Sequence, residues 1–357
     1  MYQKLSNRVG AALLFSALGL TACGENSGDK QKTATSTTNH STTIANDAQL
    51  VIYTARSEQL IKPIVEAYTK ATGVKVAFVS DKEGPLMERL SAEAENTPAD
   101  IFMTVDAGNL WQASQKGLFA PVESKTLLAN IPAHLRDPGN QWFGLSIRAR
   151  TIFFNKDKVK PEQLSTYQAL AGDQWKGKLC LRTSKKVYNQ SLVAMLNAEE
   201  GAEKTEKMLK GWVNNLAAPV FPDDTKLLEA IAAGQCEVGI ANTYYYGRML
   251  DKTPNINVGI FWANQNAKGV HVNVSGAGVT KYAKHKEEAV KFLEWLSSDQ
   301  AQGMFADSNF EFPANSKIKP NTLVTNWGSF KQNMINVSEA GAGQAEAVKL
   351  MDKAGYQ

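Results

Sequence analysis

The sequence has 357 residues, enough for about two domains of ordinary size. Hydrophobic residues make up 43% and charged residues 21%, which is typical of a soluble globular protein and excludes fibrous, collagen-like and disordered chains. The 39 basic and 35 acidic side chains give a net charge of +4, too balanced for nucleic acid to be the main partner.

The N-terminus has the features of an export signal. Lys4 and Arg8 form a basic start, and the apolar run 11–20 is far shorter than the ~20 residues of a membrane-spanning helix. The next residues, LTAC at 20–23, resemble the bacterial lipobox, in which the cysteine becomes the lipidated first residue of the mature protein. We predict signal-peptide removal and a lipid anchor on Cys23; an ordinary cleavage site with a coincidental cysteine is the alternative.

Residues 24–48 are rich in Ser, Thr, Asn and Asp and show no apolar periodicity, so we expect a flexible tether. The predicted location is the periplasm or cell envelope, with the lipid as the only membrane attachment. Such an oxidising compartment permits Cys180 and Cys236 to pair. We expect one disulfide, and two buried free thiols are the alternative.

The folded part opens with a strand, a helix and a second strand. The apolar run 49–54 predicts a strand, apolar residues share one helical face over 57–71, and the run 74–79 predicts the next strand. This βαβ unit implies a parallel pair. Strands and helices continue to alternate over 83–94, 99–104, 143–155, 179–182, 191–197, 203–214, 226–233 and 237–241. The predicted fold class is α/β throughout.

Two extended segments interrupt this alternation. Residues 144–155 and 270–280 are rich in β-formers, and each is too long for one short core strand. Two lobes need such a pair of segments if the chain crosses between them twice. We therefore predict a signal peptide at 1–22, a lipid-anchored tether at 23–48, lobe one at 49–148 plus 270–322, and lobe two at 149–269 plus 323–357.

The most unusual local feature is the motif NTYYYGR at 242–248, between a predicted strand and a helix. Three of the ten tyrosines lie here. At a helix start successive side chains are about 100° apart, so neighbouring phenols can face one cavity. Aromatic side chains that fill an interlobe core are the alternative.

A further tyrosine, Tyr188, lies in the polar segment SKKVYNQS at 184–191, which we expect to be a loop between a strand and a helix. In open α/β sheets, ligand groups gather at the carboxyl ends of strands, and polar loops before helices bind anions through free backbone N–H groups. A solvent-facing turn tyrosine is the alternative.

Three phenolates suit a trivalent cation. A phenol has a pKa of about 10 and stays neutral at pH 7 unless a strong positive charge removes its proton. Hard oxygen donors prefer hard ions such as Fe³⁺, and three phenolates cancel its three charges. The histidines outside the tether, His134, His271 and His285, show no metal-ligand spacing.

These motifs, together with PADIFMTVDAGNLWQA and KEEAVKFLEWLSSDQAQ, resemble the ferric-iron-binding proteins that supply bacterial ABC importers. The resemblance covers the chain from about residue 49 and implies a two-lobed periplasmic-binding-protein fold of the class II type, with two crossover strands as hinge. It implies that Tyr188, Tyr244 and Tyr245 bind the metal between the lobes. It also implies that Asn242 supports these ligands and that Arg150 holds a synergistic anion such as carbonate.

The chain departs from this family in lobe one. Many relatives have a His or Tyr ligand directly after the first strand, where this chain has Arg56, Ser57 and Glu58. The fourth ligand therefore stays open, and Arg56 is a second candidate for the anion. Ser57 suits a helix N-cap and Glu58 a first-turn acid. We expect Asp106 at most to support the site, and Tyr246 to pack.

Two other functions stay open. A two-lobed protein for phosphonate, thiamine or a polyamine would use the tyrosines to stack on or hydrogen-bond its cargo. An exported hydrolase is a third hypothesis, but the sequence has no G-x-S-x-G elbow, no H-E-x-x-H and no pair of motif-borne carboxylates, so we expect no enzyme. We expect a monomer whose partners are ferric iron and an importer permease.

Overall fold

The computed structural model describes residues 47–357. The predicted signal peptide, the lipidated Cys23 and nearly all of the tether lie outside these described residues. Within residues 47–357, no helix combines the length and apolarity that crossing a membrane requires.

The described chain opens with the predicted βαβ unit. Strands β1 (Leu50–Thr54) and β2 (Val76–Ser80) are parallel, which confirms the prediction. The helix between them, α1 (Glu58–Thr72), turns its apolar face inward and continues through Pro63. It ends at Gly73, whose φ of 78° is in the left-handed region that glycine adopts without strain.

The strands form one nine-stranded sheet with the order β2-β1-β3-β8-β4-β6-β5, and β7 and β9 each pair with β4. The remaining strands are β3 (Ile101–Val105), β4 (Phe143–Asn155), β5 (Leu179–Cys180), β6 (Val238–Asn242), β7 (Val258–Phe261), β8 (Val272–Val279) and β9 (Phe312–Pro313).

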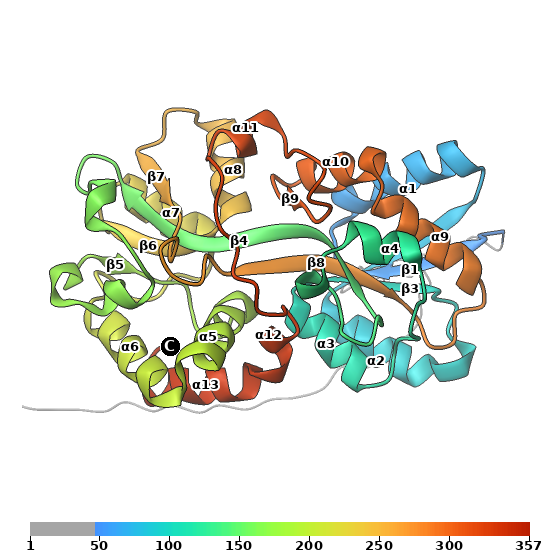
Figure 1. Ribbon diagram of the computed structural model, residues 1–357, viewed down its shortest axis with the longest axis horizontal. Helices are drawn as coiled ribbons and strands as arrows, with labels where there is room; N and C mark the ends of the chain where they lie inside the picture. The colour runs from blue at the N-terminus through green and yellow to red at the C-terminus, as the bar shows by residue number, and fades with distance from the viewer. Residues whose placement is uncertain (1–46) are drawn as a thin grey trace, which may run out of the picture. The chain divides into compact units, whose positions relative to one another are not determined.

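Strand β4 links the two ends of this sheet (Figure 1). Its residues 143–149 pair with β8, and its residues from Arg150 onward pair with β6 and β7. All 13 residues of β4 are buried, as expected for a strand with neighbours along its whole length. The two long segments predicted from the sequence are therefore both central strands.

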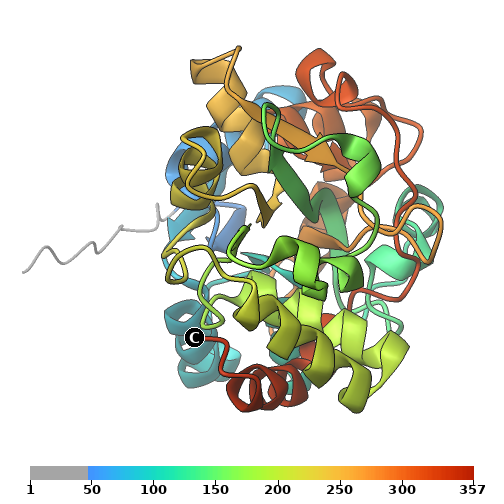
Figure 2. The same ribbon diagram turned by 90° about the vertical axis from the view of Figure 1, so that its left-hand side faces the viewer.

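Helices cover both faces of the sheet. They are α2 (Glu83–Glu93), α3 (Ala107–Gln115), α4 (Lys125–Asn130), α5 (Val187–Glu200), α6 (Ala202–Asn214), α7 (Asp224–Ala232), α8 (Thr243–Lys252), α9 (Lys286–Leu296), α10 (Asp299–Asp307), α11 (Thr322–Thr325), α12 (Glu339–Ala342) and α13 (Gln344–Lys353). Figures 1 and 2 show α5, α6 and α13 on one side of the strands and α7 and α8 on the other.

We call β1–β3, β9, α1–α4, α9 and α10 the first half, and β5–β7 with α5–α8 the second half. The short helix α12 packs between α3 of the first half and α5 of the second. Its fit depends on small residues, because a Cβ on Gly341 would lie 2.5 Å from Cβ of Trp111. Beside it, Ser191 donates a hydrogen bond to the buried Asp106 across the two halves (3.0 Å).

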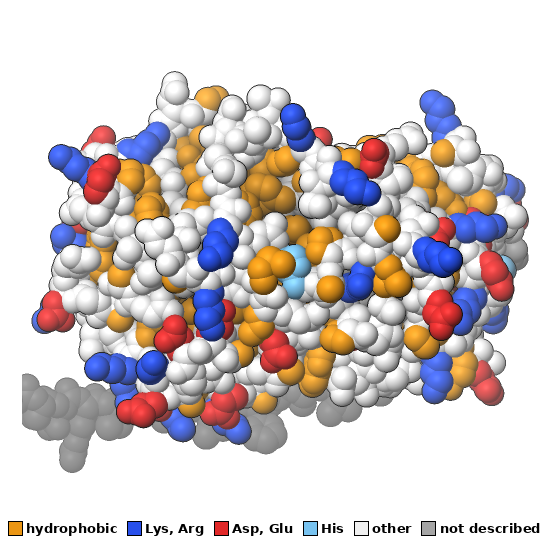
Figure 3. All heavy atoms as spheres, in the orientation of Figure 1, with side chains coloured by type: hydrophobic (Ala, Val, Ile, Leu, Met, Phe, Trp, Pro, Cys, Tyr) orange, Lys and Arg blue, Asp and Glu red, His pale blue; other side chains and the backbone are white. Residues whose placement is uncertain are grey.

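The surface carries both signs of charge. Figure 3 shows acidic and basic side chains interspersed over one face, while hydrophobic side chains gather in the hollow between α11 and α10. This distribution gives that face no basic patch of the kind that binds nucleic acid.

Candidate metal centre

A cavity of about 220 Å³ lies between the two halves. The second half contributes the three predicted tyrosines and Arg248, and the first half contributes residues that follow β1 and that precede β9. The lining residues are Ala55, Arg56, Ser57, Leu60, Val105, Tyr188, Tyr244, Tyr245, Arg248, Asn309 and Glu311. The structure thus brings the three predicted ligands together.

Two helix starts position the tyrosines. Tyr244 and Tyr245 lie in the first turn of α8, directly after β6, with their ring centroids 4.3 Å apart. Tyr188 lies in the first turn of α5, so the prediction of a loop at this position is wrong. Because both helices begin near the carboxyl ends of neighbouring parallel strands, their first turns meet at the same edge.

Two of the three phenols, those of Tyr188 and Tyr244, are buried, and their surroundings favour the protonated form. Tyr188 is 9% exposed and Tyr244 is 6% exposed. Burial raises the pKa of Tyr188, an effect that the Arg148 guanidinium partly offsets. Burial, followed by the neighbouring phenols Tyr188 and Tyr245, raises the pKa of Tyr244 well above its usual value. A bound cation of high charge would favour the phenolates and reverse this preference.

Four arginines lie near the phenols, and three of them were not predicted from the sequence. The distance from the guanidinium Cζ to the ring centroid of Tyr188 is 5.5 Å for Arg148 and 5.4 Å for Arg182. Cζ of Arg248 lies 5.2 Å from the ring centroid of Tyr244. Arg56, the predicted one, is buried beside Glu311, with 3.5 Å between its Nη1 and Oε2 of the glutamate.

Several of these guanidinium nitrogens have no hydrogen-bond partner among the described residues. They are Nε and Nη1 of Arg56, Nε and Nη2 of Arg148, and Nε of Arg182. Buried polar groups are normally paired, and leaving one unpaired costs about 1–3 kcal/mol. Arg56 lines the cavity, and Arg148 and Arg182 lie against the ring of Tyr188, so these unsatisfied donors point to an anionic guest near this tyrosine.

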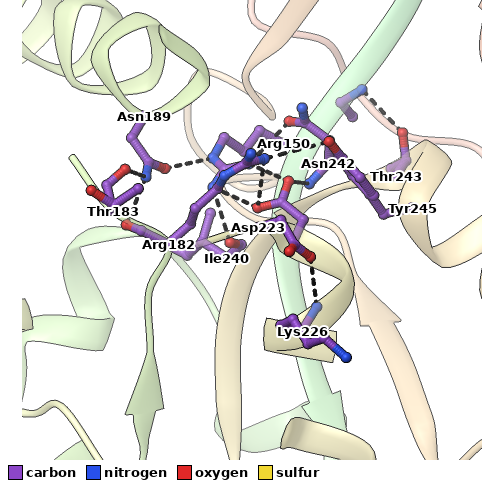
Figure 4. A network of polar contacts seen from close by, with 12 residues as sticks. Arg150, Arg182, Thr183, Asn189, Asp223, Lys226, Ile240, Asn242, Thr243 and Tyr245 are labelled. Atoms are coloured by element: carbon purple, nitrogen blue, oxygen red, sulfur yellow. Dashed lines mark hydrogen bonds and ion pairs between the residues drawn. The ribbon is translucent and has the colours of Figure 1, made fainter. Parts of the chain in front are cut away.

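Arg150 lies elsewhere, in the polar network of Figure 4. Its guanidinium donates to both carboxylate oxygens of Asp224 (2.9 and 3.4 Å) and to Oδ1 of Asn189 (2.9 Å). Asp224 is fully buried and also accepts from the backbone N–H of Asn242 (3.0 Å). Arg150 is not among the residues that line the cavity, and an anion there would have to compete with Asp224 for it.

The other predicted residues have structural places. Asn242 precedes α8 and accepts from Arg150 through Oδ1 (3.2 Å), so it contacts the arginine network. Tyr246 packs on Phe153 and donates to the carbonyl of Val258, as expected for a packing residue. Asp106 caps α3 through Gly108 N–H, and burial raises the pKa of its carboxyl.

Near β1, Ser57 is the N-cap residue of α1, although its side chain makes no capping hydrogen bond. Glu58 is exposed and is not among the cavity-lining residues. The acid that does line the cavity is Glu311, which was not predicted from the sequence.

The two predicted cysteine partners form a disulfide in the structure. Cys180 ends β5 and Cys236 lies just ahead of β6, with their Cα atoms 5.8 Å apart, a normal disulfide spacing. Among residues 47–357, no group of three His, Cys, Asp or Glu side chains is placed to hold a metal. The tyrosine cavity is therefore the candidate metal centre of the described chain.

The chain has an α/β fold in which long central strands join two halves and a cavity lies between them. This architecture is typical of solute-binding proteins. The chain belongs to the bacterial extracellular solute-binding protein family, whose model matches residues 53–303.

Similar proteins carry iron in their names. Iron uptake protein A1 of Synechocystis is 42% identical over 87% of this chain and 88% of its own length. A Trichodesmium protein, IdiA or FutA, solved with iron and citrate ligands, is 44% identical with a TM-score of 0.84, over 86% of this chain and 99% of its own. The ferric iron-binding protein A of Mannheimia haemolytica, in an open conformation, is 36% identical with a TM-score of 0.82, over 86% and 98%.

Proposed function

We propose that the protein captures ferric iron outside the cytoplasm and delivers it to an ABC importer. One observation carries this proposal: three phenols from two helix starts converge on one cavity between the halves. Phenolate oxygens are hard donors that suit Fe³⁺, and three of them balance its charge. Tyr188, Tyr244 and Tyr245 are the proposed ligands.

The visible spectrum tests this function. Ferric citrate added to the purified protein should produce a phenolate-to-iron charge-transfer band at about one iron per chain. The double variant Tyr244→Phe/Tyr245→Phe should lose the band, because a phenyl ring has no oxygen donor. The matched control is Tyr282→Phe, which changes an exposed tyrosine outside the cavity. A double variant with unchanged colour and stoichiometry would refute the ligand assignment.

We further propose that an anion such as carbonate accompanies the iron. The unpaired nitrogens of Arg148 and Nε of Arg56 support an anion in the cavity, whereas Nη1 of Arg56 already faces Glu311 and Arg150 would first have to release Asp224. Arg148→Ala should therefore weaken iron binding in carbonate buffer more than in carbonate-free buffer. An equal effect in both buffers would remove the anion from the proposal.

The proposed transport cycle uses the whole exported protein. Cys23 would carry the lipid, and residues 23–48 would tether a monomer to the membrane. The halves would act as the lobes 49–148 plus 270–322 and 149–269 plus 323–357, which approach each other on cargo. An importer permease would then receive the iron.

Capture of a small phosphonate is a second candidate, and the surplus of arginine donors around the cavity favours it. Tight phosphonate binding without a visible iron band would select that cargo. Turnover of an added substrate would instead indicate an enzyme.

A further inference from the structure

The first half contributes no tyrosine to the cavity, which raises the question of what holds it against the second half. One segment of the first half reaches α8 directly. Residues 308–311, between α10 and β9, form what we call the 308–311 turn. Asn309 and Glu311 of this turn line the cavity with the three tyrosines.

The first contact between this turn and α8 is steric. Gly247 of α8 is buried against Phe310, and a Cβ at position 247 would lie 2.5 Å from Cβ and 2.7 Å from Cγ of Phe310. Real Cβ atoms do not approach that closely, so only glycine permits this contact.

The second contact is polar. Arg248, whose guanidinium lies over the rings of Tyr244 and Tyr245, donates a hydrogen bond to Oδ1 of Asn309. Asn309 in turn donates to Oε1 of Glu311 (2.8 Å), whose other oxygen faces Arg56. A continuous series of polar contacts therefore connects the proposed ligands with the first half.

The backbone of the turn is strained. Phe310 has a φ of 53°, in the left-handed region that a bulky aromatic residue rarely adopts. Such strain costs about 1–3 kcal/mol and persists only where the surroundings hold it. The backbone N–H groups of Phe310 and Glu311, which donate to carbonyls of Asp307 and Ala306, hold it from the α10 side.

Resting on the proposed function, we propose that the 308–311 turn is the element of the first half that closes onto α8 when iron is bound. Asn309 and Phe310 are positioning residues. They act on the iron through Arg248 and Gly247, and they compensate for the tyrosine or histidine ligand that the segment after β1 lacks. The turn, in place of a fourth protein ligand, is what couples iron to closure.

The central test is Gly247→Ala, which places a methyl group between α8 and Phe310 and so keeps the halves apart. Iron affinity, measured by chelator competition, should fall by about 5- to 150-fold, the usual range for coupling between two states. The charge-transfer band at saturating iron should keep its wavelength, because the phenols all belong to the second half. The matched control is Gly303→Ala in α10, where a Cβ would meet nothing within 4 Å.

Amide hydrogen exchange provides a readout that does not depend on affinity. Iron should protect the amides of the 308–311 turn in the wild type and in Gly303→Ala, and should fail to protect them in Gly247→Ala. The double variant Gly247→Ala/Phe310→Gly removes the opposing Cβ and ring and suits a positive φ. Its affinity and its protection should return toward the wild type.

The experiments distinguish a failure of the proposed role of the 308–311 turn from a failure of the proposed iron-binding function. Wild-type affinity and protection in Gly247→Ala, or a double variant as weak as Gly247→Ala alone, would overturn the role of the turn while leaving iron binding intact. A shifted band in Gly247→Ala would also overturn it, since the methyl group would then act on the ligands themselves. A wild-type protein with no band would overturn the proposed function first.

Discussion

Neutralising Asp224 should destabilise the protein more than almost any other single conservative change. Its carboxylate is fully buried and pairs with Arg150, whose side chain is 2% exposed, while Arg182 lies 3.6 Å away. Asp224→Asn keeps the shape but leaves two buried guanidinium groups without their counter-charge. Breaking a buried pair in this way costs about 3–5 kcal/mol, against a total stability of about 5–15 kcal/mol.

The measurement is urea unfolding of the iron-free protein, because bound cargo would add its own stabilisation. The neighbouring variant Asp223→Asn is the control. Asp223 caps α7 by accepting from Lys226 N–H (2.8 Å), and asparagine caps equally well, so its effect should stay within about 0.5 kcal/mol. A loss below about 1 kcal/mol for Asp224→Asn would refute the view that Asp224 neutralises the buried arginines.

Three further predictions concern protons and thiols. Three phenols that are neutral at pH 7 must release three protons to bind iron as phenolates, and burial, which raises the pKa of Tyr188 and Tyr244, strengthens this competition. Chelator competition should therefore show affinity rising with pH by about a thousandfold per unit, and pH-independent affinity would exclude phenolate ligation. Burial lowers the pKa of His271 to about 3, so the unfolded chain takes up a proton that the folded protein excludes, and stability should fall as pH drops from about 6.5 toward 3. His271→Gln should flatten that acid slope of the urea midpoint, by at most about 1.4 kcal/mol per pH unit. Thiol counting on unreduced, unfolded Cys23→Ser protein should find no free thiol, and two reactive thiols would contradict the Cys180–Cys236 disulfide.

Much of the framework could be predicted because local patterns determine it. The runs that became β1, β2 and β4 are apolar and β-branched, and the predicted ends lie within two residues of the observed ones. The start of α5 was placed too late, since the polar residues before Ser191 show no apolar periodicity. That helix begins at Val187, where Tyr188 is buried by tertiary contacts with the arginines.

The roles of the arginines could not be predicted in the same way. Alternation along β4 puts Arg148 and Arg150 on the same face of the strand. Which of them faces the tyrosines depends on Asp224, 74 residues further on, which pairs with Arg150. Asn309 and Glu311 enter the cavity from still further along the chain, and no motif near them signals it.

The packing of α12 has a practical consequence for protein engineering. Gly341 contacts Trp111 from α12, and Gly247 contacts Phe310 from α8. Figure 1 shows α12 and α8 on opposite sides of β4. Bulk added on opposite sides of a pivot turns it in opposite directions, so a larger residue at 341 should favour closure where one at 247 favours opening. Substitutions at positions 247 and 341 should therefore shift the balance between the open and closed forms in opposite directions, and neither residue is a proposed iron ligand. A graded series of substitutions at each position should therefore give iron-binding proteins with different affinities that keep the same visible charge-transfer band.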